Sequence, residues 1–198
     1  VEQLRLRLEA NRREGRVFDF VLQMPGSRIA QSDWASTYDA GSAESFWRTL
    51  TTSGTLARSY VSTDDISPFL PALAGFHRKV YFSTAFRIAP TLVTLSGVNV
   101  FSGRGDLRLR GDLTLRRTDG RPEALAATVD ELHVAGSLQE RCYELFLRQK
   151  MPAPLPAVGD VRFEGRLAYD RRGRGSLKGR LGTQLGSLAL EASMRGAV

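Results

Sequence analysis

The stretch Leu107-Arg108-Leu109-Arg110-Gly111-Asp112-Leu113-Thr114-Leu115-Arg116 decides the fold class of this chain. Its odd-numbered positions carry leucine or glycine, and its even-numbered positions carry arginine, aspartate or threonine. Successive side chains of a β-strand point to opposite faces, so this alternation predicts a strand with one apolar face and one ionic face. An amphipathic helix would repeat its apolar residues every three to four positions instead.

The same alternation returns along most of the chain, and short Gly-rich connectors at 170–175 and 182–186 favour hairpins between neighbouring strands. We therefore predict an all-β fold with a few short helices, built as a long antiparallel meander. The apolar positions of the other alternating stretches are Leu4, Leu6 and Leu8; Phe18, Phe20 and Leu22; Val80, Phe82, Phe86 and Ile88; Val161, Phe163, Leu167 and Tyr169; Leu177 and Leu181; and Leu188, Leu190, Ala192 and Met194.

Three short helices are expected between the strands. The first covers Leu138–Gln149 and opens on a capping box of Ser137 and Glu140. A second lies at 43–50, and a third of one or two turns lies at 67–70. The alternate prolines of residues 151–156 predict an extended connector, because proline has no amide hydrogen to donate.

Length and composition predict a single β-rich segment, residues 1–198, with a sub-boundary at the Pro-rich connector 150–158. The chain is 42% hydrophobic and carries 28 basic against 21 acidic residues, a formal charge of +7. It contains neither an apolar run long enough to span a membrane nor a signal peptide. Because periodic stretches run to both ends, we expect the segment to belong to a longer protein.

The sequence contains few residues that could form a catalytic or metal-binding site. The single Cys142 excludes an internal disulfide, and His77 and His133 lie far apart, so we expect no metal site, no cofactor and no enzyme. Asp130 and Glu131 precede His133 closely, but alternation places Asp130 and His133 on opposite faces. A surface histidine is the simpler interpretation of this cluster.

Two further patterns are weak. Arg-Gly-Asp occurs at 104–106 and 110–112, where a chain with 25 arginines and 19 glycines produces the triplet readily. The densest basic patch comprises Arg171, Arg172, Arg174, Lys178 and Arg180. No aromatic residue interleaves it as a base-stacking platform, so nucleic acid is not an expected partner, whereas anionic lipid headgroups suit the patch.

The apolar face itself is the informative feature. About ten strands share it, and three short helices offer little material to cover it. Three arrangements solve this problem: a closed sandwich, a closed barrel, or an open trough filled by something else. The residues alone leave all three open and favour the closed forms.

The order of features from Ser62 onward resembles that of the large TamB members of the AsmA-like superfamily, in the form found in Bacteroidota. The features are a short helix from Asp65-Ile66 to Phe69-Leu70-Pro71, the strand through 80–88, Gly-rich strands at 107–115 and 125–134, and a capped helix with a Pro-rich tail. Two further strands follow: one with a central glycine lies in 159–167, and the next lies in 181–188 with a Thr-x-x-Gly turn. The resemblance covers about two thirds of the chain, and the first sixty residues fit by strand pattern only.

The resemblance implies an open β-taco, a bridge-like lipid-transfer protein anchored in the inner membrane and crossing the periplasm. Its hydrophobic groove is expected to conduct phospholipid acyl chains toward the outer membrane and so support outer-membrane biogenesis. The alternative is a structural or interaction module that helps an outer-membrane barrel protein translocate and assemble through its sheet edges. Arg171, Arg172, Arg174 and Lys178 are candidates for headgroup contacts. The residues expected to line the groove are Leu107, Leu109, Leu113, Leu115, Val161, Phe163, Leu167, Leu177, Leu181, Leu188 and Leu190.

Overall fold

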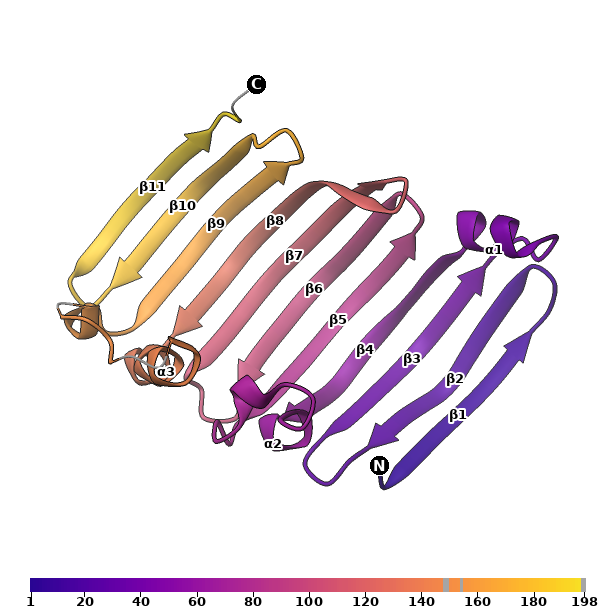
Figure 1. Ribbon diagram of the computed structural model, residues 1–198, viewed down its shortest axis with the longest axis horizontal. Coiled ribbons are helices and arrows are strands. Elements are labelled where there is room, and N and C mark those ends of the chain that lie inside the picture. Colours follow the sequence, from indigo (N-terminus) through magenta and orange to yellow (C-terminus); the bar gives the residue numbers. More distant parts are fainter. Residues whose placement is uncertain (148–149, 154, 197–198) are drawn as a thin grey trace.

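The chain forms one open sheet of eleven strands in a computed structural model that describes residues 1–147, 150–153 and 155–196 (Figure 1). The strands are β1 (Gln3–Ala10), β2 (Glu14–Gln23), β3 (Arg28–Thr37), β4 (Thr51–Ser62), β5 (Lys79–Ala89), β6 (Leu92–Ser102), β7 (Leu107–Thr118), β8 (Arg121–Val134), β9 (Val161–Asp170), β10 (Gly175–Thr183) and β11 (Gly186–Met194). The short helical elements are α1 (Ala43–Thr49), α2 (Thr63–Ile66), η1 (Pro71–Leu73), α3 (Gly136–Cys142), η2 (Tyr143–Leu147, a π-helix) and η3 (Leu155–Val158).

Every strand pairs antiparallel with its neighbours in sequence, in the order β1 to β11. The two edges of the sheet, β1 and β11, lie at opposite ends of the molecule and do not pair with each other (Figure 1). The all-β antiparallel meander expected from the sequence is therefore confirmed in its open form. The closed sandwich and barrel are wrong, because all eleven strands belong to one unclosed sheet.

Strand register decides which side chains share a face. One cross-strand row runs Leu113, Ala127, Leu167, Leu177 and Ala192 from β7 to β11. The next residue along each strand begins the opposite row, Thr114, Ala126, Ala168 and Ser176. The alternation read from single strands thus adds up across the sheet to one apolar face and one polar face.

β-Bulges interrupt this register in several strands. In β2 the extra residue is Asp19, which has a φ of 52°, between the pairs Arg5 with Val21 and Arg7 with Phe18. A bulge moves the following side chains to the other face, so Phe18 lies with Arg7, whose guanidinium is 5.3 Å from the ring centroid. The expectation that Phe18 shares a face with Leu22 is therefore wrong.

The helical elements lie at the ends of the strands rather than over a face (Figure 1). Helix α1 agrees with the predicted helix at 43–50 and is capped by the Ser42 side chain, which accepts a hydrogen bond from Ser45 N–H. Helix α2 begins earlier than the expected turn at 67–70, because Ser62 provides its cap. Residues 67–70 form the turn that leads from α2 into η1.

The observed helix differs from the one predicted at 138–149 in its first residue and in its hydrogen-bonding pattern. Ala135 occupies the N-cap of α3 and offers no side-chain hydrogen bond, so the capping box of Ser137 and Glu140 is wrong. The helix continues as the π-helix η2, and residues 148–149 lie outside the described residues. The Pro-rich connector is not extended throughout, because Leu155–Val158 form the 3-10 helix η3.

The sheet has almost no hydrophobic core. Leu138 of α3, 6% exposed, is the one hydrophobic residue that is buried among the described residues. The accessible surface is 13454 Å², whereas a compact monomer of this mass exposes about 9,300 Å². The chain therefore exposes about 4,000 Å² more surface than a compact monomer of the same mass.

Candidate functional site: an uncovered apolar sheet face

All eleven residues predicted to line a groove lie on the same face of the sheet, called here the apolar face. Each belongs to a row in which apolar or glycine residues oppose one another across the strands. The rows are Leu115, Leu125, Tyr169, Gly175 and Met194; Leu113, Ala127, Leu167, Leu177 and Ala192; Gly111, Val129, Gly165, Gly179 and Leu190; Leu109, Leu132, Phe163, Leu181 and Leu188; and Leu107, Val134 and Val161.

The area of the apolar face can be estimated from strand geometry. The five strands β7–β11, about 4.8 Å apart and each about 33 Å long, give a face of about 800 Å². The largest apolar patch of a typical soluble monomer is about 300–600 Å². An exposed face of this size indicates contact with another apolar surface.

The centre of the apolar face is smooth because two glycines oppose each other there. Gly165 of β9 pairs with Gly179 of β10, and the ring of Phe163 lies across both. A Cβ atom added at Gly179 would lie 2.8 Å from Phe163 Cε2, and one added at Gly165 would lie 2.9 Å from Phe163 Cζ. The missing side chains let the aromatic ring lie along the sheet, which gives a flat surface there.

The apolar face is more polar toward the N-terminal half. Gln31 of β3 and Ser59 of β4 lie in its rows, and Ser59, 1% exposed, exchanges hydrogen bonds of 3.0 Å with both backbone groups of Ala30. Gln31 Nε2 is buried without a hydrogen-bond partner. The part of the face over β7–β11 is therefore the most uniformly apolar, and it is the part that the sequence singled out.

The polar face carries the charged residues in ion pairs. Arg108 and Arg110 of β7 both approach Glu131 of β8, at 3.6 and 3.9 Å. The hollows over β7–β11 also lie on this face, between long side chains. One of about 560 Å³ is lined by Thr114, Arg116, Ala126 and Ala168 among others. The apolar face is thus an open surface, whereas the polar face is uneven.

The predicted headgroup residues fall into two places. Arg171, Arg172 and Arg174 lie at the turn between β9 and β10, at one rim of the sheet. Arg174 pairs with Asp170 at 2.6 Å, and Arg171 approaches Glu123 at 3.9 Å. The hydrogen bond from Arg174 lowers the pKa of Asp170 below its ordinary value.

Lys178 does not belong to this rim cluster. It lies within β10 on the polar face, 3.7 Å from Glu191 of β11. A lipid headgroup at the rim of the apolar face would meet Arg171, Arg172 and Arg174, and it would not meet Lys178.

An aromatic ladder that the alternation pattern did not predict crosses three strands of the polar face. Tyr60, Tyr81 and Phe101 lie in one cross-strand row of β4, β5 and β6. Their ring centroids are 5.6 and 5.0 Å apart, and the rings of Tyr81 and Phe101 are stacked at an interplanar angle of 9°. Lys79 Nζ lies 4.6 Å from the centroid of Tyr60. Because these rings face each other, they stabilise strand pairing and offer little ring surface for stacking a ligand.

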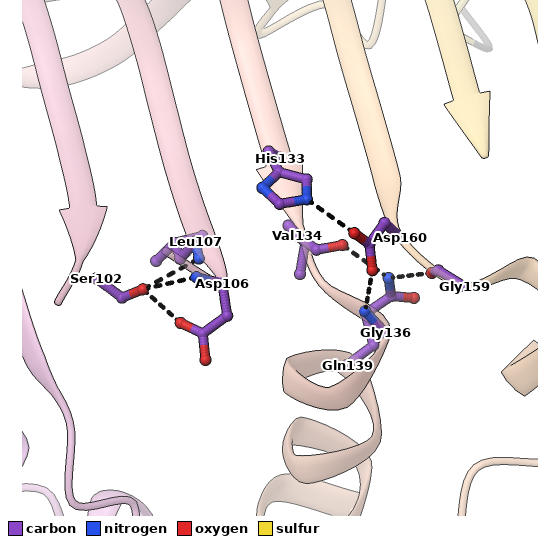
Figure 2. Close-up of polar contacts among 9 residues, drawn as sticks. All are labelled: Ser102, Asp106, Leu107, His133, Val134, Gly136, Gln139, Gly159 and Asp160. Atoms are coloured by element: carbon purple, nitrogen blue, oxygen red, sulfur yellow. Dashed lines mark hydrogen bonds and ion pairs between the residues drawn. The ribbon is translucent and has the colours of Figure 1, made fainter. Parts of the chain in front are cut away.

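A polar cluster fixes helix α3 to the end of the sheet (Figure 2). Asp160 accepts a hydrogen bond from Gly136 N–H at 3.1 Å and contacts His133 Nε2 at 3.2 Å. Gln139 Nε2 donates to the carbonyls of Val134 and Gly159. The Gly136 amide and then His133 lower the pKa of Asp160. His133 therefore has a structural partner, and its side chain is 21% exposed.

A second polar cluster at the same end surrounds Asp106, which precedes β7. Its carboxylate pairs with Arg78, and both side chains are 11% exposed. Ser102 Oγ donates to the same carboxylate and accepts the amide hydrogens of Asp106 and Leu107 (Figure 2). Burial raises the pKa of the nearby Cys142 thiol, which favours its protonated form.

Within residues 1–147, 150–153 and 155–196, no three His, Cys, Asp or Glu side chains gather as metal ligands. No helix of this part of the chain has the length and apolar character needed to cross a membrane. Comparisons with family models, with curated proteins and with solved structures each find no match to this chain. The apolar face is thus the feature on which a functional proposal rests.

Proposed function

We propose that this chain is a segment of a lipid-transfer protein and that its apolar face carries the acyl chains of phospholipid. The observation behind the proposal is the apolar face of β7–β11, which the described chain leaves uncovered. In this proposal the segment is the periplasmic part of a cell-envelope protein anchored in the inner membrane. It supports outer-membrane biogenesis, as the resemblance to the TamB proteins implies, and it carries out no chemical reaction.

The energetics favour a continuous apolar surface for such transfer. Moving a sixteen-carbon chain from a bilayer into water costs about 12 kcal/mol, at about 0.8 kcal/mol per methylene. A face lined by leucine, valine and phenylalanine replaces most of the water contact and so removes most of that cost. Movement from one strand to the next then changes the free energy little, because successive rows present similar side chains.

Headgroups would remain in water at the rim of the sheet. The turn that holds Arg171, Arg172 and Arg174 lies where β9 and β10 end, next to the apolar row of Tyr169 and Gly175. Guanidinium groups bind phosphate through paired hydrogen bonds. Arg172 is the most available of the three, since Arg171 and Arg174 already lie near acidic partners.

The experiment is native mass spectrometry with lipid extraction, on the chain exported to a bacterial periplasm and purified without detergent. Leu167→Asp and Ala168→Asp form a matched pair, because they place the same charge at neighbouring positions of β9 on opposite faces. We expect phospholipid on the wild type and on Ala168→Asp, and its loss from Leu167→Asp and Leu109→Asp. Circular dichroism controls for folding.

The result that would overturn the proposal is a wild-type chain that is folded, monodisperse and free of lipid. Equal lipid retention by Leu167→Asp and Ala168→Asp would also count against it, because binding would then not depend on the apolar face.

A structural or interaction module is the second candidate function, and the open edge strands favour it. Both β1 and β11 expose unpaired backbone groups along one side. Such an edge can add a strand of a partner, for example of an outer-membrane barrel protein during its assembly. A lipid-free chain that captures such a barrel protein, and loses it when an edge strand carries proline, would favour this function.

A further inference from the structure

The strands of the apolar face end at two unlike rims. At one end of β7–β10 lie the tight turns that join β7 to β8 and β9 to β10, and residues 116–123 and 169–175 are called here the hairpin rim. At the other end lies α3 (Figure 1), followed by η2 and η3, and residues 103–106 and 135–160 are called the helical rim. A phospholipid on the apolar face therefore has two different places for its headgroup.

The two rims carry different charge. The helical rim has four basic and four acidic residues, whereas the hairpin rim has six arginines against Asp119, Glu123 and Asp170, a net charge of +3. Because the sheet is a single layer and the Debye length is about 8 Å, arginines on both of its faces attract a phosphate at this rim. The six arginines are Arg116, Arg117, Arg121, Arg171, Arg172 and Arg174.

The acidic residues of the hairpin rim leave most of these arginines without an acidic partner. Asp170 is engaged in its own turn, where it pairs with Arg174 at 2.6 Å and accepts the amide hydrogen of Arg172 at 2.9 Å. Glu123 lies 3.9 Å from Arg171, and both side chains are exposed. Among the described residues, the hairpin-rim arginines that form no ion pair are Arg116, Arg117, Arg121 and Arg172.

Tyr169 marks the boundary where the apolar face meets the hairpin rim. It belongs to the last apolar row, opposite Leu125, and is 49% exposed. Tyrosine suits the level between acyl chains and headgroups, because its ring is apolar and its hydroxyl group is polar. The ladder continues beyond it, since Arg171 N–H donates to the Glu123 carbonyl at 2.8 Å. Side chains alternate along a strand, so Arg171 follows Tyr169 on the apolar side.

The charges of the helical rim balance one another and largely bind the chain itself. Asp106 pairs with Arg78, and Asp160 accepts the first amide hydrogen of α3. Arg141 donates to the Gly75 carbonyl at 3.0 Å. A phosphate at this rim would meet no surplus of positive charge.

We propose that the hairpin rim of β7–β10 holds the phosphate of the bound lipid and selects anionic headgroups over zwitterionic ones. The inference rests on the proposed function, because it starts from a lipid on the apolar face, and it adds the class of headgroup and its place. A headgroup with net negative charge is attracted by all six arginines. A zwitterionic headgroup carries an ammonium group that the same field repels.

The first test mixes the chain with vesicles of equal parts phosphatidylglycerol and phosphatidylethanolamine that have identical acyl chains. The protein is separated from the vesicles by flotation, and the lipid that it carries is quantified by mass spectrometry. We expect phosphatidylglycerol to be enriched about fivefold on the wild type. High salt should reduce this enrichment, because it screens charge, and should leave the total amount of carried lipid undiminished.

Three double variants locate the preference. Arg171→Gln with Arg172→Gln removes two charges from the hairpin rim, so the enrichment should fall to about twofold or less while the total lipid stays the same. Arg171→Lys with Arg172→Lys keeps the charge and should keep the preference. The matched control is Arg104→Gln with Lys150→Gln, which removes the same charge from the helical rim and should leave the enrichment unchanged. Circular dichroism controls for folding.

The second test finds the headgroup directly. A fluorophore is attached in a Cys142→Ser background to Thr118→Cys, at the hairpin rim, or to Leu185→Cys, in the β10–β11 turn at the opposite end of the strands. Neither substitution changes the charge of a rim. We expect a nitroxide on the lipid headgroup to quench the label at residue 118 more strongly than the label at residue 185.

The outcomes separate this inference from the proposed function. Equal carriage of both lipids, a preference that survives the loss of the charges at 171 and 172, or stronger quenching at residue 185 would overturn the inference alone. Attachment to phosphatidylglycerol vesicles without removal of lipid would overturn it as well, because the rim would then bind a membrane surface. A wild type that neither carries lipid nor attaches to vesicles would overturn the proposed function, and this inference with it.

Discussion

The ring of Phe163 lies over Gly179, and a Cβ atom at residue 179 would come within 2.8 Å of ring atom Cε2. It would also come within 2.3 Å of the Glu164 carbonyl oxygen on the neighbouring strand. Both contacts are closer than real Cβ atoms make. Residue 179 must therefore be glycine, because a larger residue would collide with both the Phe163 ring and the backbone of the neighbouring strand.

Gly179→Ala is expected to destabilise the sheet by about 1–3 kcal/mol, because the ring and the strand pair must both shift. Gly175→Ala on the same strand and face is the control, since an added Cβ there meets nothing closer than 3.5 Å. Urea titration followed by circular dichroism compares the two. Equal midpoints for both variants would show that Phe163 and the strands adjust without cost.

The ion pair of Arg78 and Asp106 is expected to stabilise the end of the sheet only as a pair. Removing one partner leaves an uncompensated, nearly buried charge, so Arg78→Met or Asp106→Leu should each cost about 3 kcal/mol. The double variant should cost clearly less than the sum. A double-mutant cycle by urea titration measures this coupling.

The exposed pair of Lys178 and Glu191 is the comparison for that cycle. Their side chains are 78% and 77% exposed, so Lys178→Met should change the stability by less than about 0.5 kcal/mol. A large coupling at this pair, or none between Arg78 and Asp106, would contradict the argument from burial.

Acid is expected to destabilise the protein partly through Asp160. Its pKa in the folded state lies below the unfolded value of about 3.9. The stability it contributes is therefore complete above the unfolded pKa and is lost as the pH falls through the folded pKa. Asp39 and Asp170, whose pKa values are also lowered, contribute with the same sign.

The variant Asp160→Asn isolates this contribution, because asparagine keeps an acceptor for Gly136 N–H and does not titrate. Between pH 5 and pH 2.5, the urea midpoint of the wild type should fall more steeply than that of Asp160→Asn. The remaining slope of the variant reports the other carboxylates. Parallel curves for the two proteins would show that Asp160 does not act as argued.

The strands and the residues of the apolar face were predictable because alternation is a local signal. The alternation within residues 107–115 alone shows which side chains share a face, without knowledge of the partner strands. The bulge at Asp19 was not predictable in this way. One extra residue changes the face of Phe18, and only the pairing of β2 with β1 reveals it.

The predicted start of α3 was wrong for a related reason. Ser137 and Glu140 match a capping motif, yet Gly136 N–H is already satisfied by Asp160, twenty-four residues away, and the helix begins two residues earlier than predicted. The ladder of Tyr60, Tyr81 and Phe101 was equally hidden, because its members are about twenty residues apart and meet only in register. Long-range polar and aromatic pairing is what a reading of single strands misses.

A sheet without a core has a consequence for how such a protein folds and changes length. Each strand contacts little beyond the strands before and after it, so stability accumulates one hairpin at a time, as in repeat proteins. Folding can start at any hairpin and spread in both directions, and the ends should fray first. Hairpins can then be gained or lost at the sheet edges without repacking an interior. The length of the sheet is therefore set by the number of hairpins in the chain.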